Sequence, residues 1–308
     1  MRVLVTGVSG YVGAALVPRL QAAGHEVRGF ARSRERVAAA GVRLDDLVLG
    51  DAVSGAGLAR ALDGADAAYY LIHSMEGPAG AFPEQERRSA GRFATAARAA
   101  GVRRVVYLGG LVPPDGARSS RHLASRLAVE DALLAAADEP IALRASIVIG
   151  ARSRSFRFLV RLIERLPVLA LPAWRGNRTA PIDGRDVLEY LARAATAPAP
   201  VAAGSWDIGG PDVMTYADMI ARIADALLVR RPSVSLDVNL TPIASVVAAA
   251  VAGEDPALIG PLMESLEHDL LPRDDAAAAA FGVRLHRFGA AVERALRDWE
   301  RTEELAAR

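Results

Sequence analysis

The chain has 308 residues, of which 52% are hydrophobic and only 5% aromatic, and its formal net charge is +1. This length suffices for one large α/β domain or for two smaller ones with sizeable cores. A charge so close to zero gives no reason to expect nucleic acid or an anionic membrane as a partner. The absence of cysteine excludes disulfides, thiol catalysis and cysteine-bound metals.

The sequence contains no lysine, so all 37 basic residues are arginine. Any mechanism that needs a lysine ammonium group or a lysine Schiff base is therefore excluded. The N-terminus enters a strand pattern directly, unlike a signal peptide, and the longest uncharged apolar segment, residues 240–253, is too short to span a bilayer. We therefore expect a cytoplasmic protein without a transmembrane segment. Residues 240–253 could pack in a core, form a dimer surface or make a peripheral membrane contact.

The first thirteen residues read as a strand, a tight turn and the start of a helix. An apolar run at residues 3–5 is followed by glycines at positions 7, 10 and 13 and by an amphipathic run from residue 11 to 23. In such a unit the glycines allow the turn, a close approach to a pyrophosphate and close packing of helix on strand. The phosphates would lie at the helix N-terminus. The alternative is a purely structural turn. We expect the cofactor to contact Gly7, Ser9, Gly10, Tyr11 and Val12.

A second strand is predicted at residues 26–30, and a basic stretch follows it at residues 31–36. An NAD-binding unit carries an acidic residue at this point, about 20 residues past the glycines, to accept a hydrogen bond from the ribose 2′-OH. Here Arg32 occupies the position, with Arg34 and Arg36 close by. A guanidinium cannot accept that bond but pairs well with a 2′-phosphate, which favours NADP over NAD. The alternative is a solvated basic turn.

Two further strands are predicted at residues 47–50 and 67–72, each followed by polar residues. Ligands bind open α/β sheets at the carboxyl ends of the strands. Asp51 could serve an ordinary turn or helix cap, or meet the adenine amino group. We expect the cofactor to run past Asp51, Ala52, Leu71, Ile72 and His73.

A fifth strand at residues 104–109, a helix at 119–137 and a sixth strand at 141–149 complete the first half. Strands that alternate with helices predict a parallel, doubly wound sheet of the Rossmann type. We expect a dinucleotide-binding domain over residues 1–150, with Gly109 near the cofactor. Residues 151–308 are expected to form a small substrate lobe with segments that return to the Rossmann core.

Several segments together resemble a known family. They are Thr6-Gly-x-x-Gly-x-x-Gly13, Gly50-Asp51, and residues 143–150, 181–191 and 206–216. The pattern resembles the short-chain dehydrogenase/reductase superfamily, and more closely its atypical NmrA-like and epimerase-like NAD(P)-binding members. The resemblance implies an NAD(P)-dependent oxidoreductase that acts on a small or hydrophobic carbonyl compound, and Arg32 favours NADPH as its cofactor. A monomer and a homodimer are both compatible with it.

The catalytic positions depart from the family pattern. Members with the usual chemistry carry Tyr-x-x-x-Lys on the helix after the fifth strand, and Ser or Thr at the end of that strand. Here His122 and Arg126 fall at the Tyr and Lys positions, and Gly109-Gly110 replaces the Ser or Thr. His122 could donate the proton, with His73 as a second candidate, and Arg126 could hold ribose or an anionic substrate. Alternatively, both cover apolar surface, and the protein is a non-catalytic redox sensor or assembly protein.

The second half holds fewer chemical signals. Arg157, Arg161 and Arg165 share one face of a predicted helix. This helix could form a lid over an apolar substrate or contact lipid. We prefer the alternative that it is a peripheral helix packed on the core. Asp183 and Asp186 are expected to support a helix start, and His286 is expected to be an ordinary surface histidine. No spacing indicates a metal site, a serine-hydrolase elbow or a nucleic-acid surface.

Overall fold

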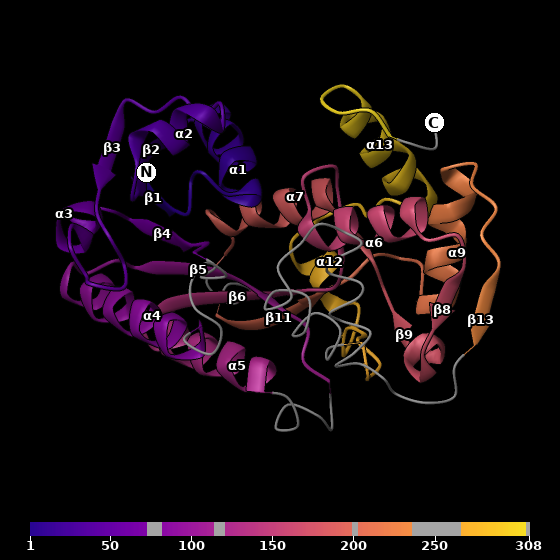
Figure 1. The fold of residues 1–308 in the computed structure, drawn as a ribbon. Coiled ribbons are helices and arrows are strands. Elements are labelled where there is room, and N and C mark those ends of the chain that lie inside the picture. Colours follow the sequence, from indigo (N-terminus) through magenta and orange to yellow (C-terminus); the bar gives the residue numbers. More distant parts are fainter. Residues whose placement is uncertain (73–81, 114–120, 199–202, 236–265, 306–308) are drawn as a thin grey trace.

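The computed structural model describes residues 1–72, 82–113, 121–198, 203–235 and 266–305 (Figure 1). They contain a seven-stranded parallel sheet in the order β11-β6-β5-β4-β1-β2-β3. Because β1 lies between β2 and β4, the strand order reverses at this point, which is the switch point of a Rossmann-type fold. The predicted parallel, doubly wound sheet is confirmed. Its strands are β1 (Arg2–Thr6), β2 (Glu26–Ala31), β3 (Asp46–Leu49), β4 (Ala67–Tyr70), β5 (Arg104–Gly110), β6 (Glu139–Ala145) and β11 (Gly204–Ile208).

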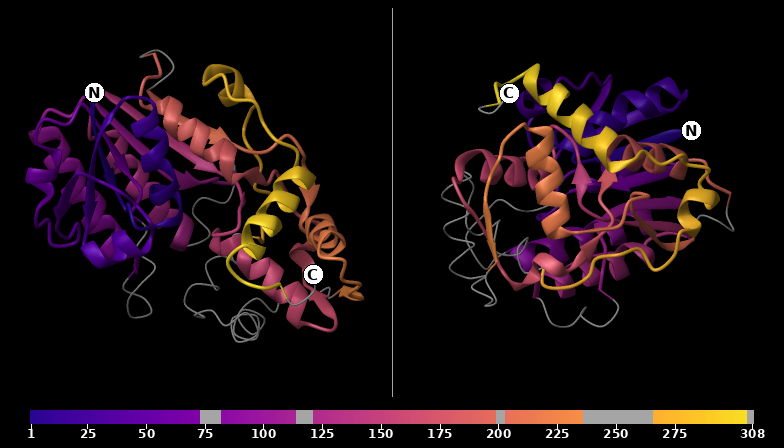
Figure 2. Two further views of the ribbon diagram at one scale, coloured as in Figure 1. Left: turned by 90° about the horizontal axis from the view of Figure 1, so that it is seen from above. Right: turned by 90° about the vertical axis from the view of Figure 1, so that its right-hand side faces the viewer.

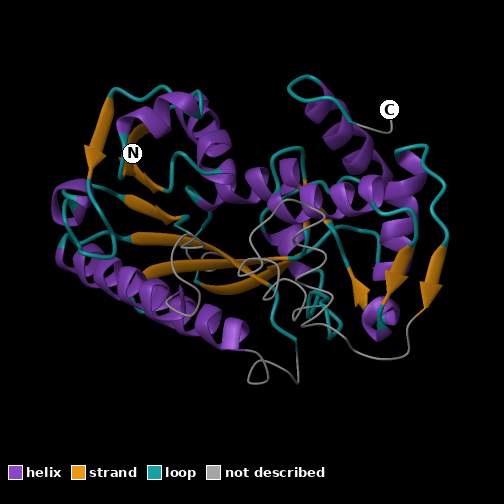
Figure 3. Cartoon of the chain, viewed as in Figure 1, coloured by secondary structure: helices purple, strands orange, loops and turns teal. Residues whose placement is uncertain are grey.

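Helices cover both faces of this sheet (Figure 3). Successive side chains of a strand point to opposite faces, so Val3 and Val5 of β1 pack on one side and Leu4 on the other. Helices α1 (Tyr11–Ala22), α2 (Arg34–Ala39) and α7 (Gly184–Ala194) bury residues in the first core, together with α12 (Ala276–Ala280). Helices α3 (Leu58–Leu62), α4 (Phe82–Ala99) and α5 (Arg121–Leu134) cover the opposite face.

A third hydrophobic cluster lies beside the sheet, and we call the elements around it the C-terminal lobe (Figure 2). Phe156, Tyr216 and Trp299 are fully buried in it. The lobe consists of α6 (Arg154–Arg165), β8 (Leu169–Leu171), η1 (Ala173–Gly176), α9 (Tyr216–Ala226) and α13 (Phe288–Glu300). Three two-stranded sheets accompany it, which pair β7 (Val148–Ile149) with β10 (Ile182–Asp183), β9 (Arg178–Thr179) with β12 (Met214–Thr215), and β8 with β13 (Ser233–Ser235).

The predicted sixth strand at residues 141–149 is wrong in one respect, because two strands share that stretch. β6 stays in the main sheet, and the N–H of Ser146 still donates to the carbonyl of Ile208 (3.1 Å). One residue later the partner changes, and Ile147 accepts from Ile182 (2.9 Å). The apolar run continues through this switch because Ile149 is buried in the C-terminal lobe.

Helix α6 packs as the core-facing alternative predicts. Phe156 and Val160 are buried on one side. On the other, the guanidinium carbons of Arg157 and Arg161 lie 4.1 and 5.0 Å from the centre of the Trp299 ring, which is within cation–π range. Both arginines also pair with Glu303. These contacts fasten α6 to the C-terminal helix.

His286 is exposed in a loop, as expected of a surface histidine, and it also makes a structural contact. Its backbone N–H donates to Asp186 Oδ2 (2.8 Å), and its Nδ1 lies 2.5 Å from Asp186 Oδ1. Asp186 is buried in the first turn of α7. The pair therefore holds the segment before α13 against the start of α7. Asp183, as predicted, supports this helix start, because its side chain accepts the N–H of Arg185 (2.8 Å).

Leu228 is the single non-glycine residue with positive φ (60°) in the ranges described, and its side chain is 81% exposed. We expect Leu228→Gly to raise the free energy of unfolding by about 0.5–1 kcal/mol, because relief of about 1–2 kcal/mol of left-handed strain exceeds the added entropy of the unfolded chain, about 0.4–1 kcal/mol. Urea unfolding measures the change. The control is Ala221→Gly, which places the same residue inside α9 and costs about 1 kcal/mol. A loss of stability in both variants would contradict the strain argument.

Candidate functional site

The glycine turn between β1 and α1 is the best defined part of the candidate site. Gly7 has a φ of 67°, and a Cβ there would lie 2.6 Å from the carbonyl oxygen of Leu71. A Cβ on Gly13 would overlap the carbonyl oxygen of Gly7 and lie 2.9 Å from its carbonyl carbon. The N–H of Gly10 closes the turn on Gly7 O (2.9 Å). Gly7 and Gly13 thus have the turn and packing roles that the sequence predicts.

The N-terminus of α1 is the part of this turn that suits an anion. Gly10 is the N-cap residue, is exposed, and has no side chain to cap the helix. The backbone N–H groups of the first helical turn carry partial positive charge and favour a phosphate. Ser9, Tyr11 and Val12 flank Gly10 and are half-buried. The structure therefore brings together the five turn residues that the sequence singles out.

Thr6 joins the turn to the neighbouring strand, a contact that the motif alone does not reveal. Its Oγ1 donates to the carbonyl of Tyr69 (2.9 Å) and accepts the N–H of Leu71 (3.1 Å). Thr6 is completely buried, so these bonds are shielded from water. They fix the carboxyl ends of β1 and β4 side by side at the switch point.

The ends of β2 and β3 carry the residues expected near the adenosine half of a dinucleotide. Arg32 follows β2 and is exposed, and Ser33 caps α2 by accepting the N–H of Arg36 (3.2 Å). Asp51 follows the end of β3, and its Oδ1 accepts the N–H of Val53 (2.7 Å). Asp51 therefore serves its own turn, which is the structural alternative. Ala52 is buried, with 5% of its surface exposed.

The carboxyl ends of β4 and β5 form the other half of the candidate site. Leu71 and Ile72 follow β4 and are half-buried. Gly109, near the end of β5, is buried, and a Cβ there would lie 2.8 Å from the Tyr107 ring. The predicted contact His73 lies outside the described residues.

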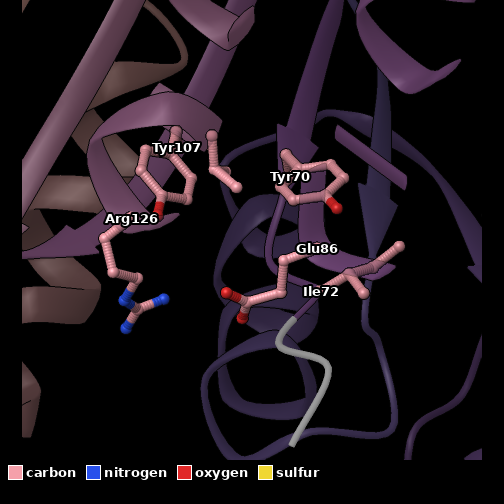
Figure 4. A pocket seen from close by; sticks show the side chains of 6 residues that line it. Tyr70, Ile72, Glu86, Tyr107 and Arg126 are labelled. Carbon is pink, nitrogen blue, oxygen red and sulfur yellow. The ribbon is translucent and has the colours of Figure 1, made fainter. Parts of the chain in front are cut away.

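Helix α5 places Arg126 beside these strand ends (Figure 4). Its guanidinium lies near the Tyr107 hydroxyl, with the Glu86 carboxylate of α4 on the other side of a narrow pocket. His122 lies one turn earlier on α5, so both residues share a helix face. The structure describes the backbone of His122 but not its side chain. The sequence gives no signal for Glu86 or Tyr70. The pocket is lined by Tyr70, Ile72, Glu86, Tyr107, Arg126 and Val129.

The pKa of Tyr107 is raised, chiefly by burial. The positive charge of Arg126 lowers this pKa, whereas the carboxylates of Glu86 and Glu130 raise it. Because the net shift is upward, the Tyr107 phenol stays protonated at neutral pH. This strand tyrosine is 3% exposed and belongs to the core.

Comparison with known proteins agrees with this geometry. Residues 7–146 match the family model described as NAD(P)H-binding. The chain therefore has the fold of NAD-dependent short-chain dehydrogenases/reductases and sugar-nucleotide dehydratases, and residues 7–146 resemble an NAD(P)H-binding domain. A comparison with curated protein sequences found no match.

Solved structures show the same fold over nearly the whole chain. A short-chain dehydrogenase/reductase superfamily protein from Agrobacterium tumefaciens with bound NAD has a TM-score of 0.71 at 20% identity, covering 98% of both chains. A dTDP-glucose 4,6-dehydratase from Streptomyces venezuelae with bound NAD has a TM-score of 0.70 at 20% identity, covering 98% of this chain and 97% of that one. A UDP-glucuronic acid 4-epimerase from Bacillus cereus, in complex with UDP-glucuronic acid and NAD, has a TM-score of 0.71 at 14% identity and 98% and 99% coverage.

The described ranges lack the features of two other classes of site. None of their helices combines the length and apolar character needed to cross a membrane. Within the same ranges, no group of three or more His, Asp or Glu side chains is arranged to hold a metal ion.

The close packing at Gly13 leads to a test of the turn. We expect Gly13→Ala to lower the free energy of unfolding by about 2–3 kcal/mol, because the new methyl group meets backbone atoms of Gly7 and Val8 that cannot move aside. The control is Gly91→Ala in α4, where a Cβ has no atom within 4 Å and should stabilise the helix by about 0.5–1 kcal/mol. Chemical unfolding measures both, and a Gly13→Ala variant as stable as the parent would contradict the packing.

Proposed function

We propose that the protein is an NADPH-dependent oxidoreductase that reduces a small or hydrophobic carbonyl compound. The observation that carries the proposal is the exposed, uncapped N-terminus of α1 at the switch point of the sheet. This is the position at which open α/β sheets bind a dinucleotide. The NAD(P)H-binding match over residues 7–146 supports the same cofactor class.

Arg32 supports NADPH over NADH. It directly follows β2, the strand beside β1, where a carboxylate would otherwise meet the ribose 2′-OH. Its guanidinium offers several donors to a 2′-phosphate and remains charged at every physiological pH. Arg34 and Arg36 are exposed on the following helix α2 and add positive charge nearby. The solved structures named above contain NAD, so the proposed preference for NADPH rests on residues of this chain and not on those structures.

The proposed reaction adds a hydride to the carbonyl carbon and a proton to its oxygen. NADPH, when bound, supplies the hydride. The protein must orient the carbonyl, exclude water and supply the proton. Arg126 is placed to hold ribose or an anionic substrate, whereas His122, one turn earlier on α5, is the proposed proton donor. His73, water or the substrate itself are the other sources of this proton.

The cofactor preference can be measured by titration with NADPH and NADH. We expect Arg32→Ala to weaken NADPH binding about 10- to 100-fold, the cost of losing hydrogen bonds to a charged group, and to leave NADH binding unchanged. The control is Arg98→Ala, in the last turn of α4, which should affect neither affinity. Equal losses for both cofactors, or tighter binding of NADH than NADPH by the parent protein, would contradict the role of Arg32.

Turnover can be tested on a carbonyl panel by following the loss of nicotinamide absorbance. On any substrate found, we expect His122→Ala to lower kcat about 100-fold or more, the usual effect of losing a general acid. The control is His25→Ala, at the amino edge of the sheet just before β2. Unchanged turnover by His122→Ala would remove this residue as the acid. Tight NADPH binding without oxidation of NADPH by any member of the panel would instead indicate a non-catalytic dinucleotide-binding protein.

A further inference from the structure

Tyr11 connects the glycine turn to a distant part of the chain. It is the first residue of α1, directly after the N-cap Gly10. Its side chain reaches two glycines that are 34 positions apart, Gly150 and Gly184. A Cβ on either glycine would overlap Tyr11 Oη. The Tyr11 phenol therefore occupies a slot that exists because both of these residues lack a side chain.

Both glycines lie where the chain enters or leaves the C-terminal side of the fold. Gly150 follows β7, and its carbonyl accepts the N–H of Ser153 (2.9 Å), the N-cap residue of α6. Gly184 is the first residue of α7, directly after the N-cap Asp183. β7 and β10 pair with each other, so the two junctions are neighbours. Tyr11 thus contacts both the turn that leads from β7 into α6 and the first residue of α7.

The charges around Tyr11 show that α13 also faces it. Burial raises the pKa of the Tyr11 phenol to about 12, and the carboxylate of Asp183 adds to this shift. Asp298 of α13 raises the same pKa, whereas Arg152 and Arg294 lower it. The phenol is therefore neutral throughout the physiological range. It suits a packing role and not proton transfer.

We propose that Tyr11 is a positioning residue that couples dinucleotide binding to the placement of the C-terminal lobe. Its backbone N–H belongs to the helix turn that would hold the pyrophosphate, and its side chain fixes the junctions from which α6 and α7 start. A ligand that restrains the first turn of α1 restrains these junctions through one residue. The coupling rests on the cofactor site proposed above, whereas the fit of the phenol between the two glycines does not.

The fit is tested by a double-mutant cycle that needs no ligand. Gly184→Ala should lower Tm by several degrees in the parent protein, because the new methyl group meets Tyr11 Oη. In a Tyr11→Phe background this drop should largely disappear, since the nearest remaining atoms are Ile149 O at 3.3 Å and Tyr11 Cζ at 3.6 Å.

Two matched variants complete this cycle. Gly150→Ala should be rescued less by Tyr11→Phe, because Tyr11 Cζ remains 3.0 Å from the new methyl group. At Gly289 a Cβ has no atom within 4 Å. Gly289→Ala should therefore cause no drop in Tm from a steric clash, whether position 11 is Tyr or Phe. An equal drop in Tm for Gly184→Ala with Tyr11 and with Phe at position 11 would overturn the fit and, with it, the proposal.

The coupling is tested by hydrogen exchange on the full chain with and without saturating NADPH. In the parent protein and in Tyr11→Phe, NADPH should slow exchange of amides at the starts of α1, α6 and α7. In Tyr11→Ala, protection of α1 should persist while the effect on α6 and α7 is lost. Protection of α6 and α7 that is unchanged in Tyr11→Ala would overturn the coupling.

The two proposals fail in different ways. If neither NADPH nor NADH protects α1 in the parent protein, the cofactor site and the coupling are both overturned, and the double-mutant cycle still reports the fit of the phenol. If NADPH protects α1 but not α6 and α7, the cofactor proposal stands and the coupling is overturned.

Discussion

The close approach of β1, β4 and α1 at the switch point determines where everything else in the N-terminal half can lie. Thr6 Oγ1 bonds both Tyr69 O and the N–H of Leu71, so the two strand ends are fixed to each other without water. Gly7 and Gly13 then let the turn and the helix come within contact of these strands. The chain has no freedom to place the first turn of α1 elsewhere, and this turn carries the partial positive charge on which an anion can be held.

At the other end of the sheet, buried arginines perform a task for which an ammonium group has too few donors. Arg104 is 2% exposed and donates to the carbonyls of Ala194, Ala195 and Ala197 as well as to Glu139. It thereby satisfies the carboxyl end of α7, which would otherwise leave carbonyl groups unpaired in the interior. A guanidinium supplies five donors in a fixed plane and a lysine supplies three on one atom. The all-arginine composition is thus used structurally. Arg144, half-buried near the carboxyl end of β6, bonds to Glu130 and lies close to Asp207, and so ties β6 to α5 and β11.

The sequence predicts the parts of this fold that depend on local pattern. The glycine turn, the first five strands and the cap at Asp183 can be predicted from the sequence because each is set by residues only a few positions apart. The division of residues 141–149 into β6 and β7 is not readable, since both pieces are buried and only the change of hydrogen-bond partner separates them. His286 and Asp186 are 100 positions apart, so no spacing rule could pair them. Glu86 of α4 and Arg126 of α5 line the same pocket, and the amphipathic pattern of α4 does not distinguish Glu86 from the other polar residues of this helix.

Binding and chemistry therefore depend on different kinds of residue in this protein. The glycine turn offers backbone groups to a ligand, and the spacing of its glycines makes it recognisable in the sequence. Proton transfer instead needs a side chain of suitable pKa. Arg126 puts a positive charge on α5, and this charge lowers the pKa of the nearby phenol. That phenol belongs to Tyr107 in β5, where burial and the carboxylates of Glu86 and Glu130 outweigh the arginine. The positive charge of Arg126 therefore does not bring the pKa of the Tyr107 phenol down to neutrality.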